Sequence, residues 1–405
     1  MDLIIIGQGY VGLPLSVIAA KSGFMVYGFD IDENKVRKLK QGITDSPEVK
    51  SMDLLSLQAE GRIEFVDAIP KLDKAAIFVI AVPTPLDRER NPDTTMLKHA
   101  CELISDVVLD NSLIINESTS FIGTLTQLIK PIIDKNSNCE NLDYAVAPER
   151  IDPGNSTWDM KSTPRILAGI NDRSTKRAYD FYSKFCSKVQ IVSQPEVAEA
   201  AKLFENTFRQ VNIALVNQLS EIASKLNFSA HEVVKAASTK PYGFMKFYPS
   251  IGVGGHCIPV DPTYLAYSAE KVGMIPTIIN LANDINIDIS KKISNRIIEL
   301  LDRSIEGKKI QLAGIAYKPN VNDVRESPAL LLIKHLKEAG AVVTWYDPIV
   351  NQLNGESSTP LSSDIDLGLI VTPHSNIDFS IWKNENVKVL DLSANSNDYG
   401  WPKFL

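Results

Sequence analysis

The chain has 405 residues, 44% of them hydrophobic, and a formal net charge of −7. This length suits two or three domains with sizeable cores, and the acidic balance argues against a nucleic-acid partner. The four cysteines form no C-x-x-C pair and the five histidines show no metal-ligand spacing, so we expect neither a disulfide framework nor a metal site. Such thiols, with no signal peptide or membrane-length apolar run, predict a cytoplasmic protein without a membrane partner.

The first part of the chain alternates strands and helices. Strands are expected at 2–6, 25–30, 78–85, 113–119 and 144–150, with helices at 12–22 and from 33 onward. This alternation predicts a parallel sheet covered by helices on both faces. Ligands of such sheets lie beyond the carboxyl ends of the strands, so we expect Thr84, Thr119 and Glu149 to face one crevice.

The middle of the chain is helical at 195–226 and again at 263–305, with a break near Gly273–Pro276 and a Gly/Pro-rich loop between the two regions. A second α/β unit follows, with strands at 308–319, 341–348, 366–371 and 387–392 and a helix at 327–340. We therefore predict an α/β fold in which two Rossmann-like, doubly wound domains (1–194 and 306–405) are joined by a central long-helix domain (195–305). Long helices in this position often dimerise, so a homodimer is expected.

A glycine turn links the first strand to the first helix. Gly7-Gln-Gly9-Tyr10-Val11-Gly12 matches G-x-G-x-x-G, in which the glycines allow a tight turn, approach of a pyrophosphate and close helix packing. Asp30 ends the second strand at the position where a carboxylate accepts ribose hydroxyls and repels a 2′-phosphate, which favours NAD over NADP. A glycine turn without a ligand, or an FAD site, is the alternative.

The loop from Gly252 to Asp261 contains the most informative thiol, Cys257. A lone cysteine is usually a small buried hydrophobic residue, and the neighbouring His256 is more often structural than a base. Glycines before this thiol nevertheless let the backbone approach a ligand. A thiol beside a nicotinamide can add to an aldehyde, and oxidation of the adduct gives a thioester that water hydrolyses.

Lys202 and Asn206 stand four residues apart, on one face of the predicted central helix. A cation and an amide side by side can stabilise an alkoxide or a thiohemiacetal oxyanion. A solvated lysine beside a surface asparagine is the alternative, and the pattern alone favours it.

Several segments together resemble the UDP-glucose/GDP-mannose dehydrogenase family: GQGYVGLPL, VPTP, NEST, APER, EAAKLFENTFRQVN, GVGGHCIPVDP and AYKPNVNDVRESP. They follow the family order over nearly the whole chain, and TKPYGFMKFYP is most similar to the UDP-N-acetyl-D-glucosamine 6-dehydrogenase branch. The resemblance implies an NAD domain, a dimerisation domain and a UDP-binding domain. It also implies four-electron oxidation of a sugar C6 alcohol to a carboxylate, for surface-polysaccharide synthesis.

The resemblance further implies roles for particular residues. Lys202 and Asp261 would hold a water and assist proton removal, Lys202 and Asn206 would stabilise the oxyanion, and Glu149 would assist thioester hydrolysis. The implied catalytic set is Cys257, Lys202, Asn206, Asp261, Glu149 and Thr119. The implied NAD contacts are Gly7, Gly9, Tyr10, Val11, Gly12, Asp30, Lys35, Thr84, Thr119 and Arg325. The implied substrate contacts are Glu149, Arg150, Lys202, Asn206, Phe247, Tyr248, Gly252 and Lys318.

Two departures bear on the sugar. Pro153 and Val260 stand where the UDP-glucose branch often has a glutamate and a lysine. These differences weaken a UDP-glucose assignment. With the TKPYGFMKFYP resemblance, UDP-N-acetylglucosamine is favoured, and UDP-N-acetylmannosamine and UDP-glucose are the alternatives. A two-electron 2-hydroxyacid-type dehydrogenase, which has no use for Cys257, and a catalytically silent nucleotide-binding protein are the rival functions.

Overall fold

The computed structural model describes every residue except 1, 45, 47, 153–156, 256 and 302–304, so Pro153 and His256 lie outside the described residues. The chain forms two compact units. The first is Met1–Glu205 with Thr263–Gly273, and the second is Asn206–Pro262 with Met274–Leu405. The three-domain boundaries given above remain predictions.

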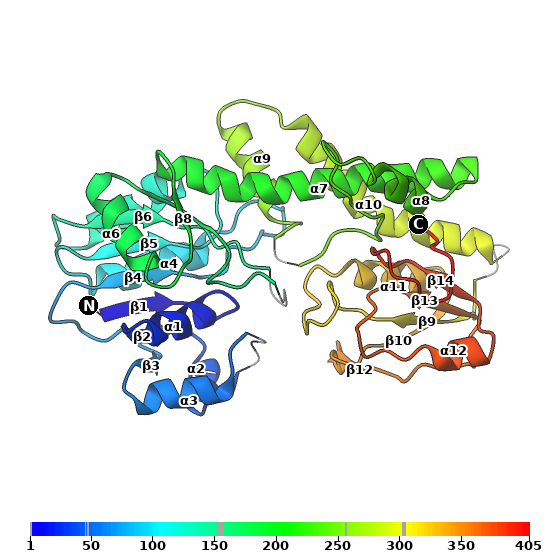
Figure 1. Cartoon of the computed structure of the whole chain (residues 1–405), viewed down its shortest axis with the longest axis horizontal. Coiled ribbons are helices and arrows are strands. Elements are labelled where there is room, and N and C mark those ends of the chain that lie inside the picture. Colours follow the sequence, from blue (N-terminus) through cyan, green and yellow to red (C-terminus); the bar gives the residue numbers. More distant parts are fainter. Residues whose placement is uncertain (1, 45, 47, 153–156, 256, 302–304) are drawn as a thin grey trace. The chain divides into compact units, whose positions relative to one another are not determined.

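The first unit is built on a sheet with the strand order β3-β2-β1-β4-β5-β6-β7-β8 (Figure 1). Its strands are β1 (Asp2–Ile6), β2 (Met25–Phe29), β3 (Ile63–Val66), β4 (Ile77–Ile80), β5 (Leu113–Asn116), β6 (Asp143–Val146), β7 (Arg165–Gly169) and β8 (Val189–Ile191). The order of the first six strands is that of dinucleotide-binding folds. All neighbouring pairs are parallel apart from β6 and β7, which run antiparallel with Ala145 opposite Gly169.

Alternate residues of β1 divide the core of this unit into two layers. Leu3 and Ile5 belong to one core, and Ile4 and Ile6 to the core on the opposite face. The first core is covered by α1 (Gly12–Lys21), α2 (Glu33–Lys40), α3 (Ser51–Ala59) and α6 (Asp172–Tyr182). The second is covered by α4 (Thr95–Ser105), the π-helical turn η1 (Leu125–Ile129) and α5 (Lys130–Asn136). A strand buried on both faces explains the continuous apolar run of β1.

The two central helical regions expected from the sequence are confirmed. The first is α7 (Pro195–Leu226), and the second consists of α9 (Asp261–Lys271) and α10 (Thr277–Leu300), separated near the expected break. A short helix, α8 (Ala230–Ala237), follows α7. The division between the units falls inside α7, after Glu205, and inside α9, after Pro262.

The second unit contains a parallel sheet with the strand order β10-β9-β13-β14 (Figure 1). Its elements are β9 (Lys309–Ala313), α11 (Pro328–Glu338), β10 (Val342–Tyr346), β13 (Leu367–Ile370), α12 (Ser380–Asn384) and β14 (Val389–Asp391), with a small hairpin of β11 (Gln352–Leu353) and β12 (Glu356–Ser357). Ile310 and Leu312 pack toward α10 and α11, whereas Ala313 and Ile370 pack with Trp382 of α12. The predicted α/β class, with two such sheets and long central helices, is confirmed.

Within the described residues, no helix has the length and apolar character that crossing a membrane requires.

Candidate active site

The glycine turn between β1 and α1 has the shape that a pyrophosphate needs. Gly7 has φ +95°, and a Cβ there would lie 2.4 Å from the Ala81 carbonyl oxygen. A Cβ on Gly12 would lie 1.8 Å from the Gly7 carbonyl oxygen, so α1 packs closely on the turn. In contrast, a Cβ on Gly9 would meet no atom within 4 Å. The turn therefore leaves open space at its middle glycine, beside the first turn of α1, and its residues fit a bound dinucleotide.

Asp30, directly after β2, is buried and held against this turn. Its Oδ2 accepts hydrogen bonds from the Gln8 amide (2.9 Å) and from Lys35 Nζ (2.8 Å), and its Oδ1 accepts one from the Asp32 amide (3.0 Å). Asp32 caps α2, the helix that carries Lys35. The predicted residues Asp30 and Lys35 thus form one ion pair beside the glycine turn. A fixed carboxylate here suits recognition of ribose hydroxyls.

Replacing Asp30 with asparagine is expected to weaken NAD binding about 10- to 100-fold, because a charge-assisted hydrogen bond is lost. NADP binding should weaken less, because the carboxylate no longer repels the 2′-phosphate. Calorimetric dissociation constants for both nucleotides measure the change in selectivity. Asp67→Asn, at the exposed position that follows β3, is the matched control. An unchanged ratio of the two constants would contradict the role of Asp30.

The ends of β4 and β5 are joined by hydrogen bonds. Thr84 Oγ1 donates to the Thr119 carbonyl oxygen (2.5 Å), and Ser118 Oγ bonds both the amide and the carbonyl of Val82 (2.9 and 2.8 Å). Tyr264 of α9 donates to the carbonyl oxygen of Thr84 (3.3 Å). The two predicted threonines therefore lie together beyond the carboxyl ends of these strands, and a crevice shared with Glu149 stays a prediction.

Glu149, three residues beyond the end of β6, has an unusual carboxyl group. Its Oε1 is buried and finds no hydrogen-bond donor among the described residues. Burial raises the pKa of Glu149 to about 7, although the positive charges of Lys202 and Arg165 oppose this shift. Lys202 itself is buried on α7. A carboxyl with this pKa can accept and release a proton at neutral pH.

Arg150 lies in an ion pair. Its Nε and Nη2 donate to the two carboxylate oxygens of Glu205 on α7 (3.0 and 2.6 Å), and its Nη1 donates to the Pro164 carbonyl oxygen (2.7 Å). The sequence predicted a substrate contact at Arg150 but gave no sign of this partner. The bidentate pair holds the guanidinium in a fixed orientation.

The thiol loop lies in the second unit and depends on its glycines. Gly255 has φ +82°, and a Cβ there would lie 2.8 Å from the Tyr317 ring. The Gly255 amide donates to the Arg325 carbonyl oxygen (3.1 Å). Two residues later, Cys257 is partly exposed, and its carbonyl oxygen accepts a hydrogen bond from the Asp261 amide (2.9 Å) at the start of α9. The thiol is therefore not sealed in the core.

Two predicted residues meet directly beside this loop. Asn206 Nδ2 of α7 donates to Asp261 Oδ2 (2.5 Å), and Asp261 is buried. This bond fixes the amide and the carboxylate relative to each other. Lys202, Glu149 and Thr119 belong to the first unit, whereas Asn206, Cys257 and Asp261 belong to the second.

The other cysteines have different surroundings. Cys101 and Cys186 are buried, and burial raises the pKa of Cys101 to about 12. Cys139 is partly exposed, and burial of its sulfur with the nearby charge of Asp110 raises its pKa. Thiolate, the reactive form, is therefore disfavoured at Cys101 and Cys139.

The loop from Phe247 to Gly252 is held on the central helices of the second unit. Asn217 of α7 accepts a hydrogen bond from the Ser250 amide (2.8 Å), and Ser290 of α10 donates to the Ile251 carbonyl oxygen (2.6 Å). Phe247 meets the Phe208 ring edge-on, and Tyr248 stacks on His231. The predicted substrate residues on this loop thus have a fixed backbone.

Lys318 lies on the loop that follows β9. Two buried residues that the sequence analysis did not single out, Asp347 and His374, hold this loop in place. Asp347 Oδ2 accepts hydrogen bonds from the Ile315 amide and from His374 Nε2 (both 2.9 Å), and His374 Nδ1 accepts one from the Asn320 amide (2.8 Å). Burial tends to raise the pKa of Asp347, but the His374 bond and the backbone amides hold it below its usual value. Asp347 directly follows β10 and His374 lies in the loop after β13, so their position beyond the ends of strands was the available signal.

Arg325, a predicted NAD contact, forms an ion pair with Asp323 (2.8 and 2.5 Å) in the second unit.

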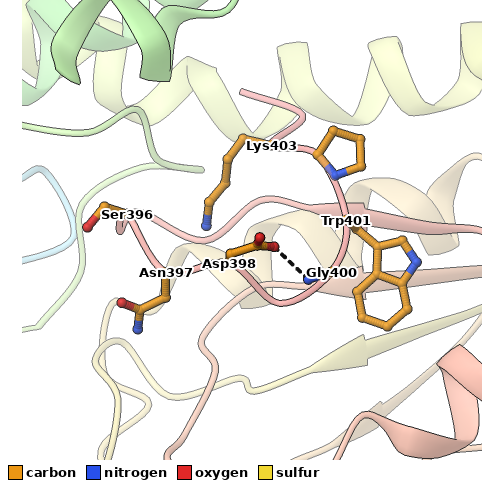
Figure 2. Close-up of a pocket in the computed structure, with 7 residues that line it drawn as sticks. Ser396, Asn397, Asp398, Gly400, Trp401 and Lys403 are labelled. Atoms are coloured by element: carbon orange, nitrogen blue, oxygen red, sulfur yellow. Dashed lines mark hydrogen bonds between the residues drawn. The ribbon is translucent and has the colours of Figure 1, made fainter. Parts of the chain in front are cut away.

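Two cavities in the described parts of the units are lined by residues other than the predicted site residues. A cavity of about 450 Å³ in the second unit is lined by residues 396–398 and 400–403 (Figure 2). There Asp398 accepts a hydrogen bond from the Gly400 amide (2.8 Å), and Lys403 forms an ion pair with Asp391 (2.9 Å). A cavity of about 240 Å³ in the first unit is lined by Pro92, Thr94, Lys98, Phe121, Gln127, Leu128, Tyr267 and Lys271.

Comparison with known proteins identifies the family. Residues 1–186, 196–288 and 311–391 match the NAD-binding, central and UDP-binding domains of the UDP-glucose/GDP-mannose dehydrogenase family. The chain is 35% identical to Protein CapL of Staphylococcus aureus over 85% of this chain and 82% of that protein. It is 34% identical to a UDP-N-acetyl-D-glucosamine 6-dehydrogenase of Pseudomonas aeruginosa over 87% of this chain and 83% of that protein.

Among solved structures, a UDP-D-ManNAc dehydrogenase of Pyrococcus horikoshii superimposes with a TM-score of 0.87 at 28% identity, covering 99% of this chain and 98% of that one. The agreement thus extends over both sheets and the central helices. The chain therefore belongs to the UDP-glucose/GDP-mannose dehydrogenase family, a family of NAD-dependent oxidoreductases.

Proposed function

We propose that this chain oxidises the C6 alcohol of a UDP-N-acetylhexosamine, with UDP-N-acetylglucosamine favoured, to the corresponding uronate. One sugar nucleotide, two NAD and one water give one uronate, two NADH and three protons. The observation that carries the proposal is the partly exposed thiol of Cys257, on a loop bonded to the Asn206–Asp261 pair. A simple two-electron dehydrogenase has no use for such a thiol.

The first oxidation needs a base that removes the C6 hydroxyl proton and a hydrogen-bond donor to the oxyanion that develops. Asp261 and Lys202 act through a water to remove the proton from the C6 hydroxyl, and Lys202 and Asn206 donate hydrogen bonds to the developing oxyanion. NAD, when bound, accepts two electrons in each oxidation. The bond between Asn206 and Asp261 keeps the amide oriented for this task.

The second oxidation proceeds through a covalent adduct. The Cys257 sulfur forms a bond to the aldehyde carbon, giving a thiohemiacetal whose oxidation yields a thioester. Water then adds to the thioester carbonyl while Glu149 accepts its proton. The C–S bond breaks, the thiolate leaves, and the uronate is released. The Glu149 pKa of about 7 suits this step.

The remaining predicted residues hold the two ligands. We assign NAD to the glycine turn with Tyr10 and Val11, and to Asp30, Lys35, Thr84, Thr119 and Arg325. We assign the sugar nucleotide to Arg150, the Phe247–Gly252 loop and Lys318. The UDP-binding domain match that includes Lys318 supports this assignment.

The sugar is tested by a direct assay. The purified protein is supplied with NAD and, separately, the UDP derivatives of N-acetylglucosamine, N-acetylmannosamine, N-acetylgalactosamine and glucose, and NADH is counted per sugar consumed. We expect two NADH per sugar and the highest kcat/KM with UDP-N-acetylglucosamine. Relatives named for both acetylated sugars make UDP-N-acetylmannosamine the alternative. One NADH per sugar with accumulating aldehyde, or NAD binding without turnover, contradicts the proposal.

We further propose that the enzyme is a homodimer that works in the cytoplasm and supplies polysaccharide precursors. None of the four cysteines is in a disulfide within the described residues, which suits a reducing cytoplasm. On α7, Phe208, Leu215 and Ile222 recur every seven residues with exposed fractions of 42%, 63% and 52%. An exposed apolar stripe of this period suits a partner helix.

Replacing Leu215 with glutamate is expected to convert the dimer to a monomer, because a charge would be buried without a partner. Light scattering after size-exclusion chromatography measures the mass. Met52→Glu, at an exposed apolar position on α3, is the control and should keep the dimer mass. A monomeric parent protein would overturn the homodimer.

A further inference from the structure

Behind Glu149, the first unit buries two opposite charges that the reaction described above does not use. Arg165 opens β7 and Glu117 follows β5, with side-chain exposures of 4% and 0%. Arg165 Nη1 lies 3.2 Å from Glu117 Oε2, and Tyr182 of α6 donates from its hydroxyl to Glu117 Oε1 (2.5 Å). The Tyr182 ring also lies 4.9 Å from the guanidinium carbon. Attraction within a buried ion pair often fails to offset its desolvation, so stability is a weak reason for this cluster.

Both charged residues are bonded to the backbone that presents Glu149. Arg165 Nη1 donates to the carbonyl oxygens of Ala147 (3.2 Å) and Pro148 (3.4 Å), the two residues before Glu149. The Glu149 amide donates to the Glu117 carbonyl oxygen (3.4 Å). Arg165 and Glu117 therefore hold the backbone at residues 147–149 through these hydrogen bonds.

We propose that Arg165 and Glu117 are positioning residues that hold the Glu149 carboxyl in place and balance its charge during thioester hydrolysis. This inference rests on the proposed function and adds two residues to its last step. In that step a proton passes from water to the Glu149 carboxylate as the C–O bond forms, and the C–S bond then breaks with the electron pair on sulfur. No additional oxidant or reductant is required.

Four charged residues influence the ionisation of Glu149. Lys202 on α7 and Arg165 on β7 favour the carboxylate, whereas Glu117 after β5 and Glu48 disfavour it. Burial, which by itself lowers the pKa of Arg165, is outweighed by Glu117 and other neighbours, so this pKa is raised. Burial and Glu117 raise the pKa of Tyr182. Arg165 thus stays cationic and Tyr182 a neutral donor throughout the working pH range.

Glu117 disfavours and Arg165 favours the ionised form of Glu149. Removing one or the other should therefore move the pH midpoint of Glu149 ionisation in opposite directions. Glu117→Gln removes a negative charge, so Glu149 ionises at lower pH. Arg165→Met removes a positive charge, so Glu149 ionises at higher pH. We expect displacements of about half a pH unit or more in each case, with the double variant between them. A purely structural role would lower the rate without producing this pattern.

The test uses two measurements on the full chain. Difference infrared spectroscopy, with Glu149→Gln as the subtraction reference, follows ionisation of the Glu149 carboxyl without any substrate. Single-turnover quench with UDP-N-acetylglucosamine and NAD, read by mass spectrometry of the acyl-enzyme, follows thioester hydrolysis against pH. Arg173→Met is the matched control. Arg173 is an exposed residue of α6 that pairs with Asp143, and its replacement should leave both pH profiles unchanged. Arg165→Lys retains the cation and should restore the wild-type pH midpoint.

The outcomes separate this inference from the proposed function. Opposite displacements in both measurements support the positioning role. Unmoved midpoints, or displacements in the same direction, overturn it even when the wild-type protein makes uronate. If the carboxyl midpoints move but the wild-type protein makes no uronate from any UDP-sugar, the proposed function fails while the effect on Glu149 stands. Glu117→Gln keeps the side-chain volume, so it remains informative if Arg165→Met does not fold.

Discussion

Replacing Cys257 with serine is expected to lower uronate formation by about three orders of magnitude or more, because a hydroxyl is a poor nucleophile without an adjacent activating base. The variant should still bind NAD and the sugar nucleotide with nearly unchanged dissociation constants, since the loop backbone is held by its glycines and by the bond to the Asp261 amide. Mass spectrometry of product, with calorimetry for both ligands, measures these quantities.

Cys139→Ser is the matched control, because Cys139 is the other partly exposed thiol in the chain. It should leave uronate formation within about twofold of the parent value, as expected for a substitution outside the site. Full activity in the Cys257 variant would remove the covalent mechanism. Equal losses in the two variants would instead indicate a general effect of thiol removal on folding.

Replacing Glu149 with glutamine is expected to slow thioester hydrolysis about 10²- to 10⁴-fold, the usual contribution of a general base. In the parent protein, hydrolysis should rise with pH through about 7, because Glu149 must be ionised to accept a proton and burial raises its pKa to that value. The variant should lose this rise and accumulate acyl-enzyme at Cys257. Rapid quench across pH, followed by intact-protein mass spectrometry, measures both effects.

The raised pKa of Glu149 also predicts a pH dependence of the free energy of unfolding that requires no substrate. Its pKa is about 7 in the folded chain against 4.5 for an unperturbed glutamate. The folded state therefore binds the proton more tightly, and the free energy of unfolding should fall as pH rises between these two values. Glu149→Gln should remove this part of the pH dependence, whereas Glu140→Gln, at an exposed position, should not. Denaturant melts at pH 5 and pH 8 compare the three proteins, and identical pH dependence in all of them would contradict the raised pKa.

Local patterns were sufficient to predict most elements of the fold. The apolar run of β1 ends in the glycine turn, that of β5 ends in polar residues, and the three-and-four spacing along α7 predicts one long helix. The sequence analysis did not predict β3, β7 or β8. Arg165 opens β7, and its antiparallel pairing with β6 makes it part of the sheet. A charged residue at the start of a strand gives no local signal of burial.

In the candidate site, contiguous motifs could be predicted from the sequence, but side-chain pairs distant in sequence could not. The glycine turn and the thiol loop are contiguous motifs that stand out in the sequence, whereas the roles expected for Asp30 and Cys257 drew on the family resemblance as well. Helical spacing put Lys202 and Asn206 on one face, but the partner of Asn206 is Asp261, 55 residues further along the chain. Arg150 likewise pairs with Glu205, and Glu117 with Arg165. Side-chain pairs that span such separations form only when the chain folds.

The partial exposure of Cys257 has a chemical consequence beyond the reaction. A sulfur that an aldehyde can reach is also reachable by peroxide, which converts thiolates first to sulfenic acid and, with excess, to sulfinic and sulfonic acids. Cys101 and Cys186 are shielded by burial. Oxidation at Cys257 would thus remove the proposed nucleophile, reversibly while the sulfur stays at the sulfenic acid level.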